Sequence, residues 1–395
     1  MTSAVEWITR LVSIDTTSRG SNLELVELVA AELRRYGLTP VTLPNDDGTK
    51  ANLVVTIPAH DGSRDGGIAL SGHTDAVPVD GQDWDTDPFT AQIRDGRLFG
   101  RGTCDMKSFI GVILATLPEL TRAPLREPVH VVLSYDEELG CLGAAQMVRQ
   151  LAGLGVRPTT CIVGEPTGMR LITAHKSINL MELTVQGVAA HSSLTTAGVN
   201  AIEYASQAIV FVRSLAEEFK AQGPYDQGYD VPYTTASVNL VNGGTAGNIV
   251  ADRCTAQFEF RSIGSVDPNA VRARIQAYCD ELQATMRHEN PKARVDLRTL
   301  AMVPGLETGE ASPAVQLGKV LGAIPSASKV TYGTEAGLFQ AVGIQTIVCG
   351  PGDIQQAHTA NEFVELDQIR ACETLFENLV LHLSTPSPIT DGATR

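Results

Sequence analysis

The sequence lacks the features that mark membrane proteins, secreted proteins and nucleic-acid-binding proteins. No apolar run reaches the ~18 residues that a membrane-spanning helix needs, and the first residues show neither a basic segment nor an apolar segment of a signal peptide. The net charge is −15, which gives no general attraction to nucleic acid or to an anionic membrane. The seven cysteines include no Cys-X-X-Cys pair, as is typical of reduced thiols. We therefore predict a cytoplasmic protein with no nucleic-acid or membrane partner.

What the chain does have is enough apolar material for a substantial core. Hydrophobic residues make up 43% of its 395 residues. At roughly 150 residues per domain, this length allows two domains. Over the first ~175 residues, short apolar segments alternate with segments of helical periodicity. This alternation predicts an α/β domain with a mixed, mostly parallel sheet that is flanked by helices.

The pattern changes at residue 178. From there the order is strand, helix, strand, strand, helix, with a last strand at 293–297, which is typical of an α+β domain with a ferredoxin-like layout. A further helix, a strand and a long C-terminal helix would then complete the first domain. We accordingly predict a first domain over residues 1–177 and 293–395, with an inserted domain over residues 178–292.

Histidines and carboxylates follow several of the predicted strands. His73 and Asp75 come after an apolar segment at 67–70, and Asp75 could accept a hydrogen bond from one His73 nitrogen while the other binds a metal. The remaining candidates come after later strands or a glycine-rich turn, and they are Asp105, Glu137, Glu138, Glu165 and His358. Each alone has an ordinary alternative, such as a solvated loop for the acids at 136–138. Because open α/β sheets form sites at the carboxyl edge, the set together predicts a pair of divalent metal ions with nitrogen and oxygen ligands.

The motifs around these residues resemble those of a known family. They are Ser71–Asp75, Gly100–Lys107, Asp136–Glu138, Gly164–Thr167 and Gln356–His358. With them the chain resembles the co-catalytic zinc aminoacylase and carboxypeptidase superfamily over nearly its whole length. Within it, the closest resemblance is to the acetylornithine deacetylase and succinyl-diaminopimelate desuccinylase group, and the implied fold is a zinc-exopeptidase-like catalytic domain with an inserted lid or dimerisation domain.

The resemblance implies a role for each residue of the predicted metal site. Two divalent ions, most often Zn²⁺ with Co²⁺ or Mn²⁺ possible, would be held by His73 and Glu165, by Glu138 and His358, and by a bridging Asp105. Asp75 would orient His73, and Glu137 would act as the general base and acid. The resemblance also implies a cis peptide bond between Asp105 and Met106.

In the inserted domain the resemblance assigns three further residues. His191 would stabilise the oxyanion, reaching the site from the partner subunit of a homodimer. Asn248 and Arg261 would contact the substrate, with the Arg261 guanidinium pairing with its α-carboxylate. From the residues alone, the alternative for His191 is an ordinary loop histidine, and the alternative for Arg261 is a surface cation on a strand.

Three segments resemble the deacetylases more than the desuccinylases, namely Ala174–Lys176, Val231–Tyr233 and Gly333–Gly337. In the last of them, Glu335 would lie near the far end of a substrate and favour the cationic side chain of ornithine. The alternative for Glu335 is an acid at a helix start. The leading prediction is a metal-dependent amidohydrolase that converts N2-acetyl-L-ornithine to L-ornithine and acetate in arginine biosynthesis. The alternatives are a succinyl-diaminopimelate desuccinylase, a broad N-acyl-L-amino-acid amidohydrolase, or a non-catalytic binding protein with this fold.

Overall fold

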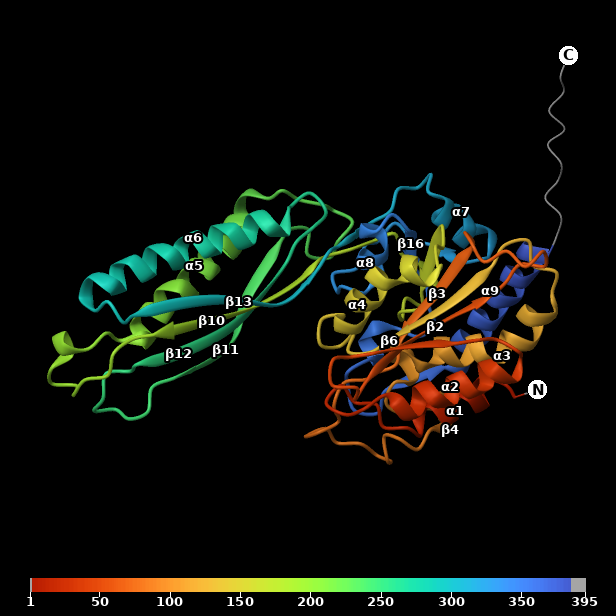
Figure 1. Ribbon diagram of the computed structural model, residues 1–395, viewed down its shortest axis with the longest axis horizontal. Helices are drawn as coiled ribbons and strands as arrows, with labels where there is room; N and C mark the ends of the chain where they lie inside the picture. The colour runs from red at the N-terminus through yellow and green to blue at the C-terminus, as the bar shows by residue number, and fades with distance from the viewer. Residues whose placement is uncertain (1, 385–395) are drawn as a thin grey trace, which may run out of the picture. The chain divides into compact units, whose positions relative to one another are not determined.

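Two units make up the structure, a computed structural model that describes residues 2–384 (Figure 1). The first unit is formed by Met1–Thr173, Thr308–Ala327 and Thr334–Arg395, so the chain leaves it twice and returns each time. The second unit is formed by Ala174–Glu307 and Ser328–Gly333. In the described part of the chain, no helix is both long enough and apolar enough to cross a membrane.

A six-stranded sheet forms the centre of the first unit. In spatial order its strands are β1 (Val41–Pro44), β2 (Ala51–Ile57), β6 (Val129–Ser134), β3 (Ile68–His73), β7 (Thr160–Val163) and β16 (Gln345–Val348). β6, β3, β7 and β16 run parallel, whereas β2 is antiparallel to both of its neighbours. Every residue of β2, β3 and β6 is buried, as expected for strands that are covered on both faces. The carboxyl ends of the four parallel strands consequently meet at one edge of the sheet.

Helices cover both faces of this sheet (Figure 1). They are α1 (Ala4–Val12), α2 (Leu23–Arg35), α3 (Ser108–Arg122), α4 (Leu142–Leu151), α7 (Pro313–Val320), α8 (Ala336–Ala341) and α9 (Leu366–Ser384). Apolar side chains of α1, α2, α3, α7 and α9 form one core with one face of the sheet, and α4 and α8 lie on the other face. Helix α1 starts with a capping box in which Ser3 and Glu6 each accept a hydrogen bond from the other residue's backbone amide.

Short elements complete the first unit. They are β4 (Gln92–Arg94), β5 (Arg97–Phe99), β17 (Phe363–Glu365), β8 (Arg170–Leu171), β15 (Ile324–Pro325), η1 (Thr103–Lys107), η2 (Ala152–Leu154) and η4 (Ile354–Gln356). β17, β5 and β4 form a three-stranded antiparallel sheet. The pairing of β17 with β5 brings the segment after residue 358 beside the segment before η1, although about 260 residues separate them in sequence.

The second unit is an antiparallel sheet with two long helices on one face (Figure 1). Its elements are β10 (Ile178–Gln186), β11 (Thr235–Gly243), β12 (Arg253–Arg261), β13 (Arg294–Val303), α5 (Ala201–Gln222), α6 (Pro268–Glu289), η3 (Thr195–Ala197), β9 (Ala174–His175) and β14 (Leu306–Glu307). Buried and part-exposed residues alternate along β10 and β12, because one face of the sheet packs on the helices. Asn200 and Asp267 cap the two helices, and Pro268 occupies the first turn of α6.

The predicted α/β fold class is confirmed by this architecture. The second unit extends past the boundary predicted at residue 292, because β13 pairs with β10 over its whole length from Arg294 to Val303. This pairing keeps the chain in the second unit as far as Glu307.

Candidate metal centre

The predicted metal ligands of the first unit gather at the carboxyl edge of its sheet. His73 is the last residue of β3, Glu137 and Glu138 follow β6, and Glu165 follows β7. His358 lies beyond β16, just after η4. Parallel strands deliver their following residues to one edge, so these side chains converge from distant parts of the sequence.

Asp105 reaches the same place from η1 rather than from the sheet. Its backbone, with φ −122° and ψ 93°, departs from helical geometry, and Gly102 precedes the element with φ 80°. The peptide bond between Asp105 and Met106 is cis, as the resemblance implied. The irregular backbone directs the Asp105 carboxylate towards both histidines.

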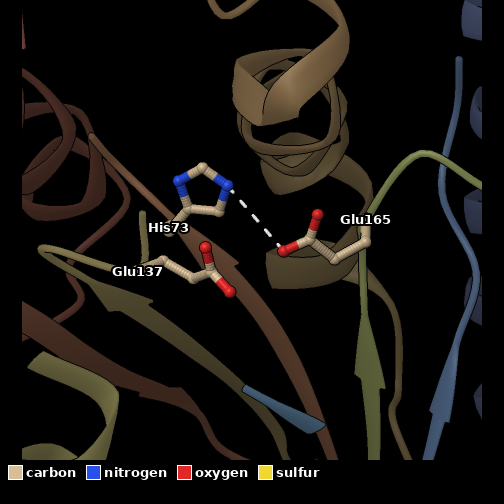
Figure 2. Close-up of side chains that lie close together, drawn as sticks. All are labelled: His73, Glu137 and Glu165. Carbon is tan, nitrogen blue, oxygen red and sulfur yellow. Dashed lines mark ion pairs between the residues drawn. The ribbon is translucent and has the colours of Figure 1, made fainter. Parts of the chain in front are cut away.

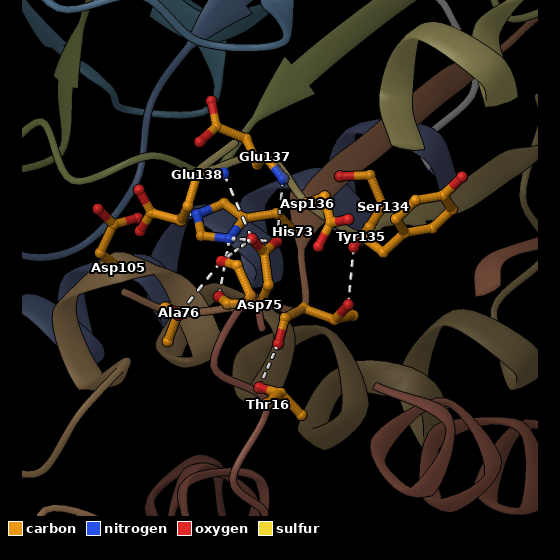
Figure 3. Close-up of polar contacts among 12 residues, drawn as sticks. Thr16, His73, Asp75, Ala76, Asp105, Ser134, Tyr135, Asp136, Glu137 and Glu138 are labelled. Carbon is orange, nitrogen blue, oxygen red and sulfur yellow. Dashed lines mark hydrogen bonds and ion pairs between the residues drawn. The ribbon is translucent and has the colours of Figure 1, made fainter. Parts of the chain in front are cut away.

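His73 is completely buried and faces carboxylates (Figure 3). Its Nδ1 lies 3.0 Å from the backbone oxygen of Asp75, and since a carbonyl only accepts, Nδ1 carries a proton. Its Nε2 lies 2.8 Å from Asp105 Oδ1 and 3.8 Å from Glu165 Oε1. Burial alone would lower the pKa of His73, but the hydrogen bonds to Asp105 and Asp75 outweigh it and raise the pKa well above the usual value. A nitrogen that faces acceptor oxygens in this way needs either a proton or a metal ion between them.

Asp75 does more than the sequence suggested. Its carboxylate Oδ1 lies 3.4 Å from His73 Nδ1, farther than its own backbone oxygen. The same carboxylate accepts hydrogen bonds from the amides of Glu137 at 3.0 Å and Glu138 at 3.3 Å (Figure 3). It also accepts one from Ser18 Oγ at 2.8 Å. Asp75 therefore holds the backbone that carries the two acids, and its contact with His73 is made chiefly through the main chain.

The outer part of the cluster is formed around His358. Its Nε2 lies 3.1 Å from Glu138 Oε1 and 3.2 Å from Asp105 Oδ2. The side chain of His358 is 50% exposed, in contrast to the buried His73. Hydrogen bonds to Asp105 and Glu138 raise the pKa of His358 to about 10. Asp105 thus contacts one histidine through each of its oxygens, which is the arrangement expected of a bridging ligand.

Glu137 and Glu165 complete the inner part (Figure 2). A ligand atom of each lies within 4.8 Å of one of His73, and so one ion could contact all three. Burial, with the negative charges of Glu138 and Asp105, raises the pKa of Glu137 to about 8. Burial and the charge of Asp105 also raise the pKa of Glu165 well above its usual value. Among the described residues, Glu165 Oε1 has no hydrogen-bond partner, although it is buried.

The donor set fits divalent metal ions. Within residues 2–384, the acids at positions 75, 105, 138 and 165 form ion pairs only with His73 and His358. Buried carboxylates at this density repel one another unless cations compensate. Imidazole nitrogens and carboxylate oxygens are the ligands that Zn²⁺ and related ions accept. The uncompensated charge and the orphaned oxygen of Glu165 both indicate a place for cations.

Glu335 lies in a different setting from the one predicted. It is fully buried, and its carboxylate accepts hydrogen bonds from Ser71 Oγ at 2.5 Å and Ser134 Oγ at 2.6 Å. These serines belong to β3 and β6, so Glu335 joins two neighbouring strands beneath the metal cluster. This burial is at odds with the predicted contact to the end of a substrate, because both carboxylate oxygens are engaged inside the first unit.

The three predicted residues of the inserted segment belong to the second unit. His191 is exposed, and its Nδ1 lies 2.8 Å from Ser193 Oγ. Asn248 is close to it, since His191 pairs with Ile249 as an isolated bridge. Arg261 ends β12 half-buried and donates to Glu259 at 3.1 Å. The structure therefore brings His191 and Asn248 together, while Arg261 is engaged with a neighbouring acid.

Some supporting residues were missed by the sequence reasoning. Cys141 donates a hydrogen bond to Glu137 Oε1 at 3.2 Å, and Ser18 binds Asp75. Glu362 binds the backbone around Asp105. No spacing marks any of them, and only the presence of an isolated acid four residues after His358 could have drawn attention to Glu362.

Comparison with known proteins identifies the family of this chain and relatives with a similar fold. Residues 69–382 match the model of peptidase family M20/M25/M40. The chain is 33% identical to the acetylornithine deacetylase of Myxococcus xanthus over 95% of this chain and 96% of that protein. A tripeptidase of Staphylococcus aureus has a similar structure, with a TM-score of 0.73 and 19% identity over 96% of this chain and 98% of that one. The YXEP protein of Bacillus subtilis, described as a dinuclear metal-binding peptidase, gives a TM-score of 0.65 and 15% identity over 97% and 98%.

Proposed function

This chain belongs to peptidase family M20/M25/M40 and is a hydrolase, and from that premise we propose that it removes the acetyl group of N2-acetyl-L-ornithine. The products would be L-ornithine and acetate, within arginine biosynthesis in the cytoplasm. The observation that carries the proposal is the similarity to acetylornithine deacetylases over nearly the whole chain. The cluster of His73, Asp105 and Glu138 supports it, because amide hydrolysis at a metal centre needs such ligands.

We assign the ligands of two divalent ions to the clustered residues. His73 and Glu165 would hold one ion, Glu138 and His358 the other, and Asp105 would contact both. Zn²⁺ suits this set best, and Co²⁺ or Mn²⁺ accept the same ligands. When bound, such ions polarise the substrate carbonyl and lower the pKa of water.

Glu137 is assigned as the general base and acid. Its carboxylate would take a proton from the attacking water as the new C–O bond forms. It would then give that proton to the nitrogen of the leaving amine as the C–N bond breaks. The raised pKa of Glu137, about 8, suits a group that must both accept and return a proton near neutral pH. Asp75 supports this role by holding the Glu137 amide.

Residues of the second unit are assigned to the substrate. His191 would stabilise the oxyanion, contributed by the partner subunit of a homodimer, and Asn248 would bind the substrate nearby. Arg261 would pair with the α-carboxylate of this small N-acyl amino acid, where a guanidinium fork fits two oxygens. The pairing of Arg261 with Glu259 keeps the guanidinium in place until a carboxylate competes for it.

The role of Arg261 predicts a specific loss in the Arg261→Lys variant. Because an ammonium cannot match two oxygens, we expect KM to rise about tenfold while kcat changes by less than about threefold. Steady-state kinetics with N2-acetyl-L-ornithine measure both. The same substitution at Arg298, a mostly exposed residue that pairs with Glu182, serves as the control. An unchanged KM would remove Arg261 from the substrate contacts.

The activity itself is tested by reconstitution. The purified protein, loaded with Zn²⁺ or Co²⁺, is given N2-acetyl-L-ornithine, N-succinyl-L,L-diaminopimelate and N-acetyl-L-methionine, with Glu137→Ala as the blank. The proposal expects the highest kcat/KM for the first substrate. A preference for the succinyl compound would keep the metal centre and overturn the specificity. Absence of bound metal after reconstitution would remove the hydrolytic mechanism altogether.

A further inference from the structure

Glu362 lies just before β17 and is almost completely buried, with a relative exposure of 1%. Its carboxylate accepts four hydrogen bonds. Oε1 accepts from the backbone amides of Cys104 at 2.8 Å and Asp105 at 3.1 Å. Oε2 accepts from the Gly102 amide at 3.1 Å and from Arg101 Nη1 at 2.6 Å. One side chain therefore binds most of the loop that presents Asp105.

The backbone amides of this loop need hydrogen-bond acceptors from another part of the chain. The backbone of Asp105 and Met106 is not helical, so regular helical hydrogen bonds do not fix the direction of the Asp105 side chain. The Asp105 carboxylate must nevertheless lie within hydrogen-bonding distance of His73 and His358 at once. A carboxylate bonded to successive amides holds such a backbone more firmly than water could, because charge-assisted hydrogen bonds are the stronger kind.

The network continues to the second histidine. Arg101, also 1% exposed, donates from Nη2 to Gln82 Oε1 at 2.5 Å. Gln82 Nε2 in turn donates to the backbone oxygen of His358 at 3.0 Å. Trp84 supports this link, since its Nε1 donates to Gln82 Oε1 and Arg101 lies over its ring at 5.0 Å. Glu362 is thus connected directly to Asp105 and through Arg101 and Gln82 to His358.

We propose that Glu362 is a positioning residue of the metal centre, which fixes the backbone of Asp105 directly and that of His358 through Arg101 and Gln82. The inference rests on the proposed metal-binding role of the cluster. A merely structural ion pair would need only the Arg101 contact. Glu362 instead also binds the amides of Cys104 and Asp105 and is linked to His358. These contacts fix the two chain segments that carry proposed metal ligands.

The test compares Glu362→Gln with Glu365→Gln. Glu365 lies three residues away, is partly exposed and pairs with Arg97 on the adjacent strand, so it is a matched control. A glutamine at 362 can still accept from the Cys104 and Asp105 amides, but its NH₂ would face the Gly102 N–H and the Arg101 guanidinium, which are donors. Co²⁺ is titrated into metal-free protein while heat and the visible absorption of the ion are recorded, and circular dichroism checks the fold.

We expect Glu362→Gln to bind Co²⁺ about 10- to 100-fold more weakly with an altered absorption spectrum, and Glu365→Gln to match the unmodified protein. Gln82→Ala breaks the link to His358 without removing a buried charge, so it tests the proposal even if Glu362→Gln does not fold. We expect it to weaken Co²⁺ binding about tenfold. Folded variants with unchanged affinity and spectrum would overturn the positioning role. Failure of the unmodified protein to bind Co²⁺ would instead overturn the metal centre on which it rests.

Discussion

One buried cluster of ionisable groups in each unit differs in kind, since the cluster at the sheet edge of the first unit is rich in carboxylates and the one near Arg261 in the second unit consists of bases. At the sheet edge of the first unit, buried carboxylates outnumber the two histidines that pair with them. In the second unit, His175 and Lys176 are buried within the electrostatic influence of Arg261. Burial and then the charge of Arg261 lower the pKa of His175 to about 4 and that of Lys176 to about 8. In the first unit, burial and the neighbouring negative charges instead raise the pKa of Glu137.

The two clusters differ in the charge of the ligand that would stabilise them. A buried excess of carboxylates is costly unless cations join it, which suits metal ions. Among residues 2–384, Lys176 Nζ has no carboxylate partner and donates to the backbone oxygen of Tyr233 at 2.6 Å. A buried excess of bases suits an anion, such as the substrate α-carboxylate that we assign to Arg261. The two clusters therefore suit ligands of opposite charge, cations in the first unit and an anion in the second.

The largest expected effect is that of Glu137→Gln in the first unit. Removing the general base should lower kcat/KM for N2-acetyl-L-ornithine by about 10²–10⁴-fold, whereas bound metal should stay unchanged, because Glu137 is not one of the assigned ligands. Activity assays and elemental analysis measure the two quantities. Glu138→Gln is the matched comparison, since loss of an assigned ligand should lower both activity and metal content. Equal loss of metal in the two variants would contradict the division of roles.

Metal removal should expose the excess negative charge of the first unit. Glu137 has a raised pKa in the folded chain, about 8, so the folded state holds its proton more tightly than the unfolded state. The stability from this group is fully present below its unfolded pKa, near ~4.5, and is lost as the pH rises through about 8. The raised pKa of His358, about 10, acts in the same direction above pH ~6.5.

We therefore expect metal-free protein to lose on the order of a few kcal/mol of unfolding free energy between pH 5 and pH 8. Urea unfolding of metal-free and Zn²⁺-loaded protein measures this difference. The metal-free Glu137→Gln variant should show a flatter dependence on pH. A metal-free protein whose stability rises over this range would show that the carboxylates do not repel one another as inferred.

His175 should give the opposite pH dependence in the second unit. Its folded pKa, about 4, is below its usual value, so its stability contribution is fully present above pH ~6.5 and is lost as the pH falls through 4. The shift corresponds to roughly 3 kcal/mol. Urea unfolding at several pH values should show a smaller acid loss in His175→Gln than in the unmodified protein. The same change at the exposed His288 is the control, and equal acid losses in both variants would contradict the assignment.

The sequence was sufficient to predict the residues that lie directly after parallel strands. His73 and Glu165 could be identified because the hydrophobic segments before them predict strands, and parallel strands deliver their ends to one edge. The same reasoning placed His358 at that edge. Local patterns therefore predicted much of the fold and the convergence of the proposed metal ligands, since both depend on periodicity and strand order.

Contacts between distant segments could not be predicted in this way. Glu362 is 257 residues from Asp105, and its partners are backbone amides that no residue type signals. The extent of β13 was also underestimated, because charged residues such as Arg294 and Arg298 alternate with apolar ones on a strand whose outer face is exposed. The burial of Glu335 could not be predicted, because a residue at the start of a short helix can be exposed or buried.

Glu335→Gln is expected to have the smallest effect. The serines can reorient their hydroxyl groups towards an amide, so we expect a loss of about 1–2 kcal/mol in unfolding free energy. Since Glu335 joins β3 to β6 through Ser71 and Ser134, kcat/KM should fall by the same factor for N2-acetyl-L-ornithine and N-acetyl-L-methionine. Ser134→Ala, which removes one of the two donors, should reproduce this pattern. A loss confined to the ornithine substrate would instead restore Glu335 as a contact to the cationic side chain, and with it the original specificity argument.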